Sequence, residues 1–144
     1  MHKQIAVVTG CAGFIGTTFT KLLLEKGWLV YGIEKFTYVA NDIEMQVLIN
    51  NYPDTFIVIK NDIKDIDRLP ECDVVFNLAA ESDVDNSIIN MDKFIDSNIS
   101  GVKNLLEIIT HKSVQIKHNK PLFFQVSTDE VYGDRTDGSF DETD

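Results

Sequence analysis

The chain has 144 residues, with 13 basic against 23 acidic side chains and a formal net charge of −10 at pH 7. An acidic surface repels nucleic acid and anionic lipid, because both are held mainly through Lys and Arg, so we expect neither as a partner. The length fits a single domain, residues 1–144, and no apolar run approaches the roughly 18 residues of a membrane span.

The two cysteines, Cys11 and Cys72, have no paired spacing and no His cluster nearby, so neither a disulfide framework nor a metal site is predicted. The chain starts directly with a short apolar run and shows no signal-peptide core. We therefore expect a reduced, cytoplasmic protein.

Short apolar runs alternate with helical spacing along the chain. Strands are expected at residues 5–8, 28–33, 56–59, 73–78 and 122–126, and helices at 14–26 and 97–110. The expected buried faces of the two helices are Ile15, Phe19, Leu22 and Leu23, and Ile99, Val102, Leu106 and Ile109. This alternation predicts an α/β fold with a doubly wound parallel sheet, followed by an acidic loop at 133–144.

A glycine-rich turn joins the first expected strand to the first expected helix. Residues 9–16 read Thr-Gly-Cys-Ala-Gly-Phe-Ile-Gly. Glycines there let the backbone turn tightly and approach a pyrophosphate, which then lies on the free amides of the helix N-terminus. A plain tight turn is the alternative, because a glycine triplet alone is weak evidence. The candidate cofactor-binding residues are Gly10, Gly13, Phe14, Ile15 and Gly16.

An acidic residue, Glu34, ends the second expected strand, 18 residues after Gly16. A carboxylate at that position accepts hydrogen bonds from the adenosine ribose hydroxyls and repels a 2′-phosphate, so NAD is favoured over NADP. The neighbouring Lys35 weakens that preference, and a solvated strand end is the alternative for Glu34. Together these features predict a Rossmann-type NAD-binding domain.

The Gly-x-x-Gly-x-x-Gly spacing resembles the extended short-chain dehydrogenase/reductases, the branch that acts on nucleotide sugars. Segments that follow the third and fourth strands and open the helix at residue 97 match further positions of that family. The resemblance implies cofactor contacts from Glu34, Lys35, Thr37, Asp62, Ile63, Leu78, Ala79, Ala80, Glu81 and Ser97. It also implies a homodimer, with the helix at 97–110 as one of the helices involved.

Residues 126–133 read Val-Ser-Thr-Asp-Glu-Val-Tyr-Gly, and this segment resembles the nucleoside-diphosphate-glucose 4,6-dehydratases, above all those that act on dTDP-glucose. Their reaction moves a hydride from C4 to NAD⁺, removes the C5 proton and protonates the departing C6 hydroxyl, which needs a base and an acid. The resemblance implies that Asp129 is the acid, Glu130 the base and Thr128 a hydroxyl near O4. It implies substrate contacts from Ser82 and Thr128, while a polar turn is the alternative for the acidic pair.

The chain departs from the family at two places. Asp83 and Asn86 stand where the family has His and Arg. The Tyr-x-x-x-Lys pair of the superfamily has one literal match, Tyr31 to Lys35, but it falls on an expected strand, where four residues span about 13 Å rather than one helical turn. We therefore expect this sequence to be the N-terminal portion of an enzyme roughly twice as long, with its fifth strand left as an edge.

Three functions follow as hypotheses. The first is the cofactor-binding portion of an NAD-dependent dehydratase of nucleoside-diphosphate sugars, a lyase, inactive as 144 residues alone. The second is a stand-alone NAD(H)-binding module without catalysis. The third is a nucleotide-sugar 4-epimerase or decarboxylase, against which the acidic pair argues. In each case Cys11, inside the glycine turn, is expected to be open to thiol reagents near the pyrophosphate.

Overall fold

Within the described residues, 3–110 and 120–144, the computed structural model contains one parallel sheet in the order β3–β2–β1–β4–β5. The strands are β1 (Ile5–Thr9), β2 (Leu29–Glu34), β3 (Phe56–Lys60), β4 (Val74–Asn77) and β5 (Leu122–Gln125). The chain builds outward from β1 to β3 and then crosses back to β4, so the order reverses beside β1. Ligands of open α/β sheets bind at such a reversal, outside the carboxyl ends of the strands. The doubly wound sheet predicted from the sequence is confirmed.

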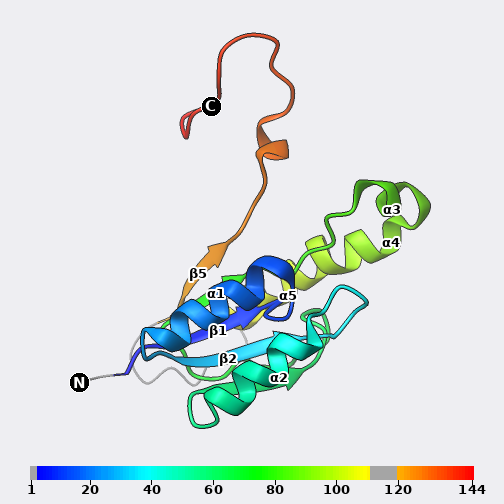
Figure 1. Ribbon diagram of the computed structural model, residues 1–144. Coiled ribbons are helices and arrows are strands. Elements are labelled where there is room, and N and C mark those ends of the chain that lie inside the picture. Colours follow the sequence, from blue (N-terminus) through cyan, green and yellow to red (C-terminus); the bar gives the residue numbers. More distant parts are fainter. Residues whose placement is uncertain (1–2, 111–119) are drawn as a thin grey trace.

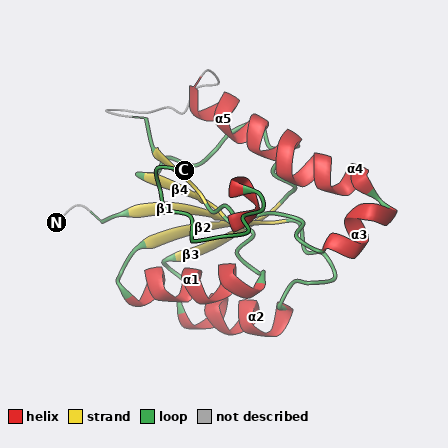
Figure 2. Cartoon of the chain, turned by 90° about the horizontal axis from the view of Figure 1, so that it is seen from above, coloured by secondary structure: helices red, strands yellow, loops and turns green. Residues whose placement is uncertain are grey.

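Helices cover both faces of the sheet (Figure 2). One face is packed by α1 (Phe14–Glu25) and α2 (Asp42–Asn51), and the other by α5 (Val102–Thr110). A helical arm leads into α5 and consists of α3 (Val84–Ile89), α4 (Met91–Phe94) and the π-helix η1 (Ile95–Gly101). The expected helix at residues 97–110 therefore begins earlier, at Met91, and changes from π to α geometry at Val102.

The sequence did not predict α2. Its apolar residues fall on two sides of the helix, because Met45 and Leu48 are buried while Ile43 and Val47 are exposed. Such a spacing does not produce one apolar stripe, which is the signal on which helix prediction rests. The helix starts at an N-cap instead, where the Asn41 side chain accepts a hydrogen bond from the Glu44 amide at 3.1 Å.

The predicted buried face of the first helix is partly wrong. Ile15 and Leu22 are 62% and 46% exposed. The face that meets the sheet instead carries small residues beside two leucines: Gly16, Thr17, Thr20, Leu23 and Leu24. The helix lies so close to the preceding turn that a side chain on Gly16 would overlap the Gly10 carbonyl. Small residues are needed at such a contact, and an apolar pattern does not register them.

The second predicted face is partly wrong for the same reason, although Ile109 is buried as predicted. Ile99 and Leu106 are exposed, whereas the residues that face the sheet are Ser97, Gly101, Leu105, Ile108 and Ile109. A Cβ on Gly101 would lie 2.5 Å from the Ile63 side chain. Close packing of the helix on the loop after β3 therefore selects the face that carries glycine.

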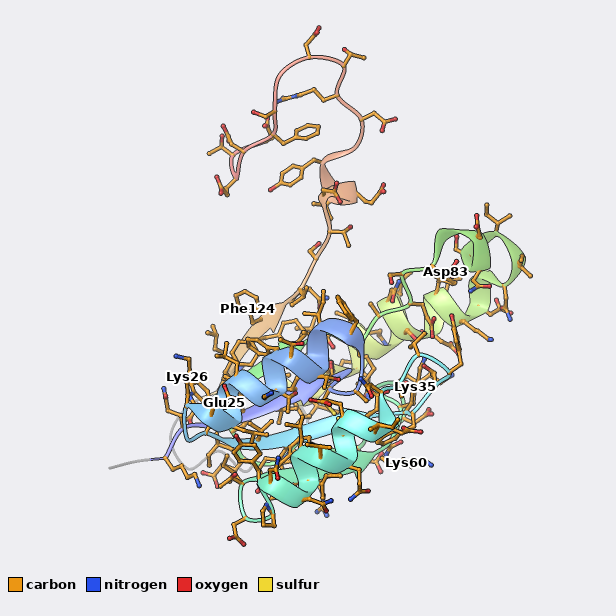
Figure 3. The ribbon with its side chains drawn as sticks, viewed as in Figure 1. Glu25, Lys26, Lys35, Lys60, Asp83 and Phe124 are labelled. Carbon is orange, nitrogen blue, oxygen red and sulfur yellow. The ribbon has the colours of Figure 1, made fainter. Side chains whose placement is uncertain are left out.

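The last strand, β5, is an edge strand as expected, and its Leu122 and Phe124 side chains are exposed (Figure 3). After β5 the chain extends away from the sheet through a short 3₁₀ helix, η2 (Asp129–Tyr132) (Figure 1). Residues 133–144 contain turns without a helix or strand, as predicted, and are closed by an ion pair between Arg135 and Asp144 at 3.0 Å. None of the helices in the described ranges is long and apolar enough to cross a membrane.

Candidate functional site

A cleft lies at the carboxyl ends of the strands, beside the reversal in strand order, which is where open α/β sheets bind their ligands. Of the residues predicted to bind a cofactor, the cleft is lined by Gly10, Gly13, Glu34, Lys35, Thr37, Asp62, Ile63, Leu78, Ala79, Ala80, Glu81 and Ser97. Three others do not line it: the side chains of Phe14 and Ile15 are exposed and Gly16 is buried beneath the turn.

Two glycines of the turn permit backbone contacts that no other residue allows. Gly10 has φ +65°, and a Cβ there would lie 2.8 Å from the backbone of Ala79. A Cβ on Gly16 would lie 1.9 Å from the Gly10 carbonyl oxygen. The turn is therefore pressed against both the start of α1 and the loop after β4.

The N-terminus of α1 adjoins the cleft through its N-cap residue. Its N-cap is Gly13, which has no side-chain cap, and the first turn carries no acidic residue. The amide of Thr17 makes the first helical hydrogen bond, to the Gly13 carbonyl at 2.9 Å, so the amides of residues 14–16 precede the helical ladder. An anion is the natural partner of such a helix end. Phe14 and Ile15 can contribute there through their backbone alone.

The Glu34 side chain links the glycine turn to the loop after β2 through two hydrogen bonds. Its side chain is 8% exposed, and its two carboxylate oxygens accept hydrogen bonds from the amides of Ala12 at 3.0 Å and Phe36 at 3.1 Å. Phe36 is held at φ +57°, a left-handed conformation that is costly for a bulky residue. A solvated strand end is therefore the wrong interpretation of Glu34. Its predicted contact with a ribose stays a prediction.

Lys35 connects the two sides of the cleft (Figure 3). Its ammonium donates to Glu81 Oε1 at 3.2 Å and to Ser97 Oγ at 2.8 Å. Asn98 in turn holds the backbone of Glu81 through two hydrogen bonds, at 2.9 and 2.8 Å. The π-helix η1 thus supplies both Ser97 and Asn98 to this junction, and π-helical turns occur frequently at functional sites.

A second hollow, of about 1100 Å³, adjoins the cleft and shares with it the wall formed by Ala79, Ala80 and Glu81. It is lined by all the residues predicted to act on or bind a substrate, which are Ser82, Thr128, Asp129 and Glu130. The last three are exposed and lie at the start of the segment that leaves the sheet. The structure thus places the predicted acid and base next to the predicted cofactor cleft.

Several lining residues were not predicted. The cleft also contains Ile33, Val39, Ala40 and Asn61, and the hollow contains Ser87, Phe94, Asn98, Val102, Gln125, Val126 and Ser127. Asn61 could have been predicted, because it directly precedes the predicted cofactor-binding residue Asp62. The others come from strand ends, loops and helices whose approach to the two sites depends on the fold.

The departure from the family at Asp83 has a local structural role. Its carboxylate accepts a hydrogen bond from the amide of Asn86 at 3.0 Å and thereby caps α3. Across residues 3–110 and 120–144, no three His, Cys, Asp or Glu side chains gather closely enough to hold a metal ion. The Asp-x-Asp spacing at Asp83 and Asp85 is therefore part of a helix start.

The prediction that Cys11 is open to thiol reagents is wrong. Its side chain is fully buried and its sulfur lies against Gly32 in β2, beneath the turn instead of in the cleft. Burial, with the nearby Glu34 carboxylate, raises the pKa of the Cys11 thiol to about 12. The thiolate is the reactive form, so this thiol is protected both by access and by charge.

We expect Cys11 in the folded protein to react with iodoacetamide at pH 8 at least about 1,000-fold more slowly than an exposed cysteine, because its pKa lies three units above the ordinary value of 9.0. Mass spectrometry of the labelled protein measures this, with the urea-unfolded protein as the control. Unfolding restores the ordinary pKa, so the free energy of unfolding is expected to fall as the pH rises from 9 toward 12. Rapid labelling of folded protein at pH 8 would contradict the buried placement.

The amino-acid sequence matches the profile of the GDP-mannose 4,6 dehydratase family over residues 7–144. It is 34% identical over 143 residues to a low-salt glycan biosynthesis protein of Haloferax volcanii, covering 96% of this chain and 44% of that protein. It is 36% identical over 138 residues to the dTDP-glucose 4,6-dehydratase of Haemophilus influenzae, covering 89% of this chain and 40% of that enzyme. The chain thus spans about two fifths of the length of these relatives.

Solved structures show the same fold. The dTDP-glucose 4,6-dehydratase of Bacillus anthracis, crystallised in complex with NAD, superposes with a TM-score of 0.73 at 28% identity, covering 96% of this chain and 42% of that one. The UDP-Glc/GlcNAc 4-epimerase of Campylobacter jejuni superposes with a TM-score of 0.81 at 21% identity, covering 97% and 42%. Because the family profile matches residues 7–144 and the two relatives are 34% and 36% identical to it over the aligned residues, the chain belongs to the GDP-mannose 4,6 dehydratase family.

Proposed function

We propose that the cleft binds NAD and that this chain forms the cofactor-binding portion of a nucleoside-diphosphate-glucose 4,6-dehydratase. The observation that carries the proposal is the shared wall of the cleft and the hollow, because it sets the cleft beside the glycine turn next to a Thr-Asp-Glu segment. The dehydratase of Bacillus anthracis, which shares the fold at 28% identity, was crystallised with NAD, which supports this choice of cofactor. Its substrate would be a nucleoside-diphosphate sugar.

The residues of the cleft fit a dinucleotide. The amides of residues 14–16 would hold the pyrophosphate, since Gly10 and Gly16 keep the backbone free of side chains there. Asp62 and Ile63 would line the adenine side, and Glu34 and Lys35 the ribose side. The buried carboxylate of Glu34 disfavours a 2′-phosphate, so NAD is preferred to NADP.

The chemistry of the hollow would follow from its acidic pair. Bound NAD would supply the hydride acceptor for the oxidation at the sugar C4 and the hydride donor for the reduction at C6. Glu130 would remove the C5 proton, Asp129 would protonate the departing C6 oxygen, and Thr128 would hydrogen-bond to the sugar O4. Ser82 lies across the same hollow and would contact the substrate.

A second candidate is an NAD(H)-binding module without catalysis. One observation favours it: Thr128, Asp129 and Glu130 are all exposed, so these three residues do not enclose a substrate site. Formation of a 4-keto sugar nucleotide by the whole enzyme, of which this chain would be a portion, separates the two, since a protein that serves only as an NAD(H)-binding module releases every sugar nucleotide unchanged. The homodimer and the cytoplasmic location implied by the sequence stay predictions.

The proposal is tested with the variant Gly13→Asp. Gly13 has an extended backbone, φ −70° and ψ 170°, and a Cβ at this position would meet only the Gly10 carbonyl oxygen, at 3.3 Å, so another residue requires that carbonyl to shift by a few tenths of an ångström. Asp is a favourable N-cap, so α1 should be as stable as before or more so, while the new carboxylate occupies and repels the pyrophosphate position. We expect the melting temperature to be kept and NAD⁺ affinity to fall by at least about 100-fold in calorimetric titration.

The matched control is Gln46→Glu, which adds the same charge on the exposed side of α2. Its NAD⁺ affinity should stay within about twofold of the wild type. The wild type should bind NAD⁺ more tightly than NADP⁺. Undiminished NAD⁺ binding by Gly13→Asp would reject the cleft as the cofactor site.

A further inference from the structure

A chain of side-chain hydrogen bonds runs through the ends of three strands beneath the wall shared by the cleft and the hollow. Thr9, Asn77 and Gln125 are the last residues of β1, β4 and β5, and they lie level in the parallel register. The Thr9 hydroxyl donates to Asn77 Oδ1. The Asn77 side-chain amide donates in turn to Gln125 Oε1 at 2.8 Å.

The two ends of this series of hydrogen bonds contact backbone atoms of the cleft and of the hollow. The Ala79 amide donates to the Thr9 hydroxyl at 3.2 Å, and Ala79 lines both the cleft and the hollow. At the other end, the Gln125 side-chain amide donates to the carbonyl of Val126 at 2.8 Å, two residues before Thr128. The series of hydrogen bonds therefore joins the wall of the cofactor cleft to the segment that carries the acidic pair.

The hydrogen bonds of this series all run in one direction, and its middle members are buried. Every donor from Ala79 to Gln125 points the same way, an order in which successive hydrogen bonds strengthen one another. Thr9 and Asn77 are fully buried, so water does not replace a partner that is removed there. Gln125 lies at the sheet edge and is exposed, so it is the member whose side chain can change without opening the core.

We propose that Asn77 and Gln125 are positioning residues, which fix the segment with Thr128, Asp129 and Glu130 against the wall of the cofactor cleft. The last backbone hydrogen bond between β4 and the chain after β5 is donated by the Val126 amide to the Asn77 carbonyl at 3.1 Å, and beyond it the segment extends away from the sheet. The side-chain hydrogen bonds of Asn77 and Gln125 lie beside this last backbone contact and thus help to set the direction in which the segment leaves. The catalytic meaning of this positioning rests on the proposed function, whereas the ordering of the segment does not.

The variant Gln125→Met tests the proposal, because Met keeps the length of the side chain and removes both hydrogen bonds. We expect deuterium exchange at the amides of residues 126–131 to become about tenfold faster, with exchange in β1 and β2 unchanged. For dehydration of the sugar nucleotide, kcat should fall on the order of 10- to 100-fold while KM and NAD⁺ affinity stay within about twofold. Gln125→Glu keeps the acceptor for Asn77 and should recover part of both effects.

The matched control is Gln46→Met, the same change on the exposed side of α2, which should leave exchange and kcat as in the wild type. Unchanged exchange at 126–131 together with unchanged kcat in Gln125→Met would overturn the positioning role, and equal losses in kcat and NAD⁺ affinity would show a general structural defect instead. Here and below, kcat is measured in the whole enzyme of which this chain is the proposed portion, because the 144 residues alone are expected to be inactive. A whole enzyme that binds NAD⁺ without turnover would reject the dehydratase, and the exchange experiment alone would then decide the positioning role.

Discussion

Replacing Glu130 with Gln is expected to lower kcat for dehydration by about 100- to 10,000-fold, with NAD⁺ affinity within about twofold of the wild type. Gln has the shape of Glu but does not accept the C5 proton. Glu130 lines the hollow and does not line the cleft, so cofactor binding is not expected to depend on it. Asp129→Asn removes the proton donor to the departing C6 oxygen and should lower kcat by a similar factor.

Steady-state kinetics with a nucleoside-diphosphate glucose and detection of the 4-keto product measure the loss. Exchange of the C5 hydrogen with solvent separates the two roles, since it should disappear in Glu130→Gln and persist better in Asp129→Asn. Glu142→Gln is the matched control, because Glu142 is an exposed acid of the same C-terminal segment that does not line the hollow. Full activity of the Asp129→Asn, Glu130→Gln double variant would remove the dehydratase assignment.

Gly16→Ala is expected to destabilise the folded protein by on the order of 3 kcal/mol or more. The new methyl group would lie 1.9 Å from the Gly10 carbonyl oxygen and 2.9 Å from its carbon. Both are backbone atoms, so relief requires that α1 or the glycine turn move. Either movement also displaces the amides of residues 14–16, and NAD⁺ binding should be lost with the stability.

Urea unfolding monitored by circular dichroism measures this effect, and Gly13→Ala is the control in the same turn. A methyl group on Gly13 meets the Gly10 carbonyl oxygen at 3.3 Å and the backbone there is extended, so a cost below about 1 kcal/mol is expected. A Gly16→Ala protein as stable as the wild type would mean that α1 lies farther from the turn than the structure has it.

Local signals account for the parts of the site that were predicted. The glycine turn was predicted because a buried strand, three glycines and a helical pattern follow one another within residues 5–26, and each feature is readable over a few residues. Asp129 and Glu130 were found through an eight-residue segment that resembles the dehydratases. The doubly wound parallel sheet followed from the alternation of strands and helices, which leaves few topologies for such a sheet.

Contacts between distant residues were not predicted, since they depend on which strands become neighbours. Lys35 meets Glu81 and Ser97 only because the ends of β2 and β4 and the helix η1 converge on one cleft. Asn77 meets Thr9 and Gln125 only because β4 lies between β1 and β5. No spacing within the sequence encodes those pairs.

The amino-acid sequence by itself determined the α/β alternation, the glycine turn at residues 9–16 and the two acidic residues of the Thr-Asp-Glu segment, because each is a local pattern. Only the tertiary structure decided which helix faces are buried, where the Cys11 thiol points and how Glu34 is held. The physical reason is close packing: Gly16 and Gly101 let their helices approach the turn and the loop after β3, and that approach, more than hydrophobicity, selects the buried face.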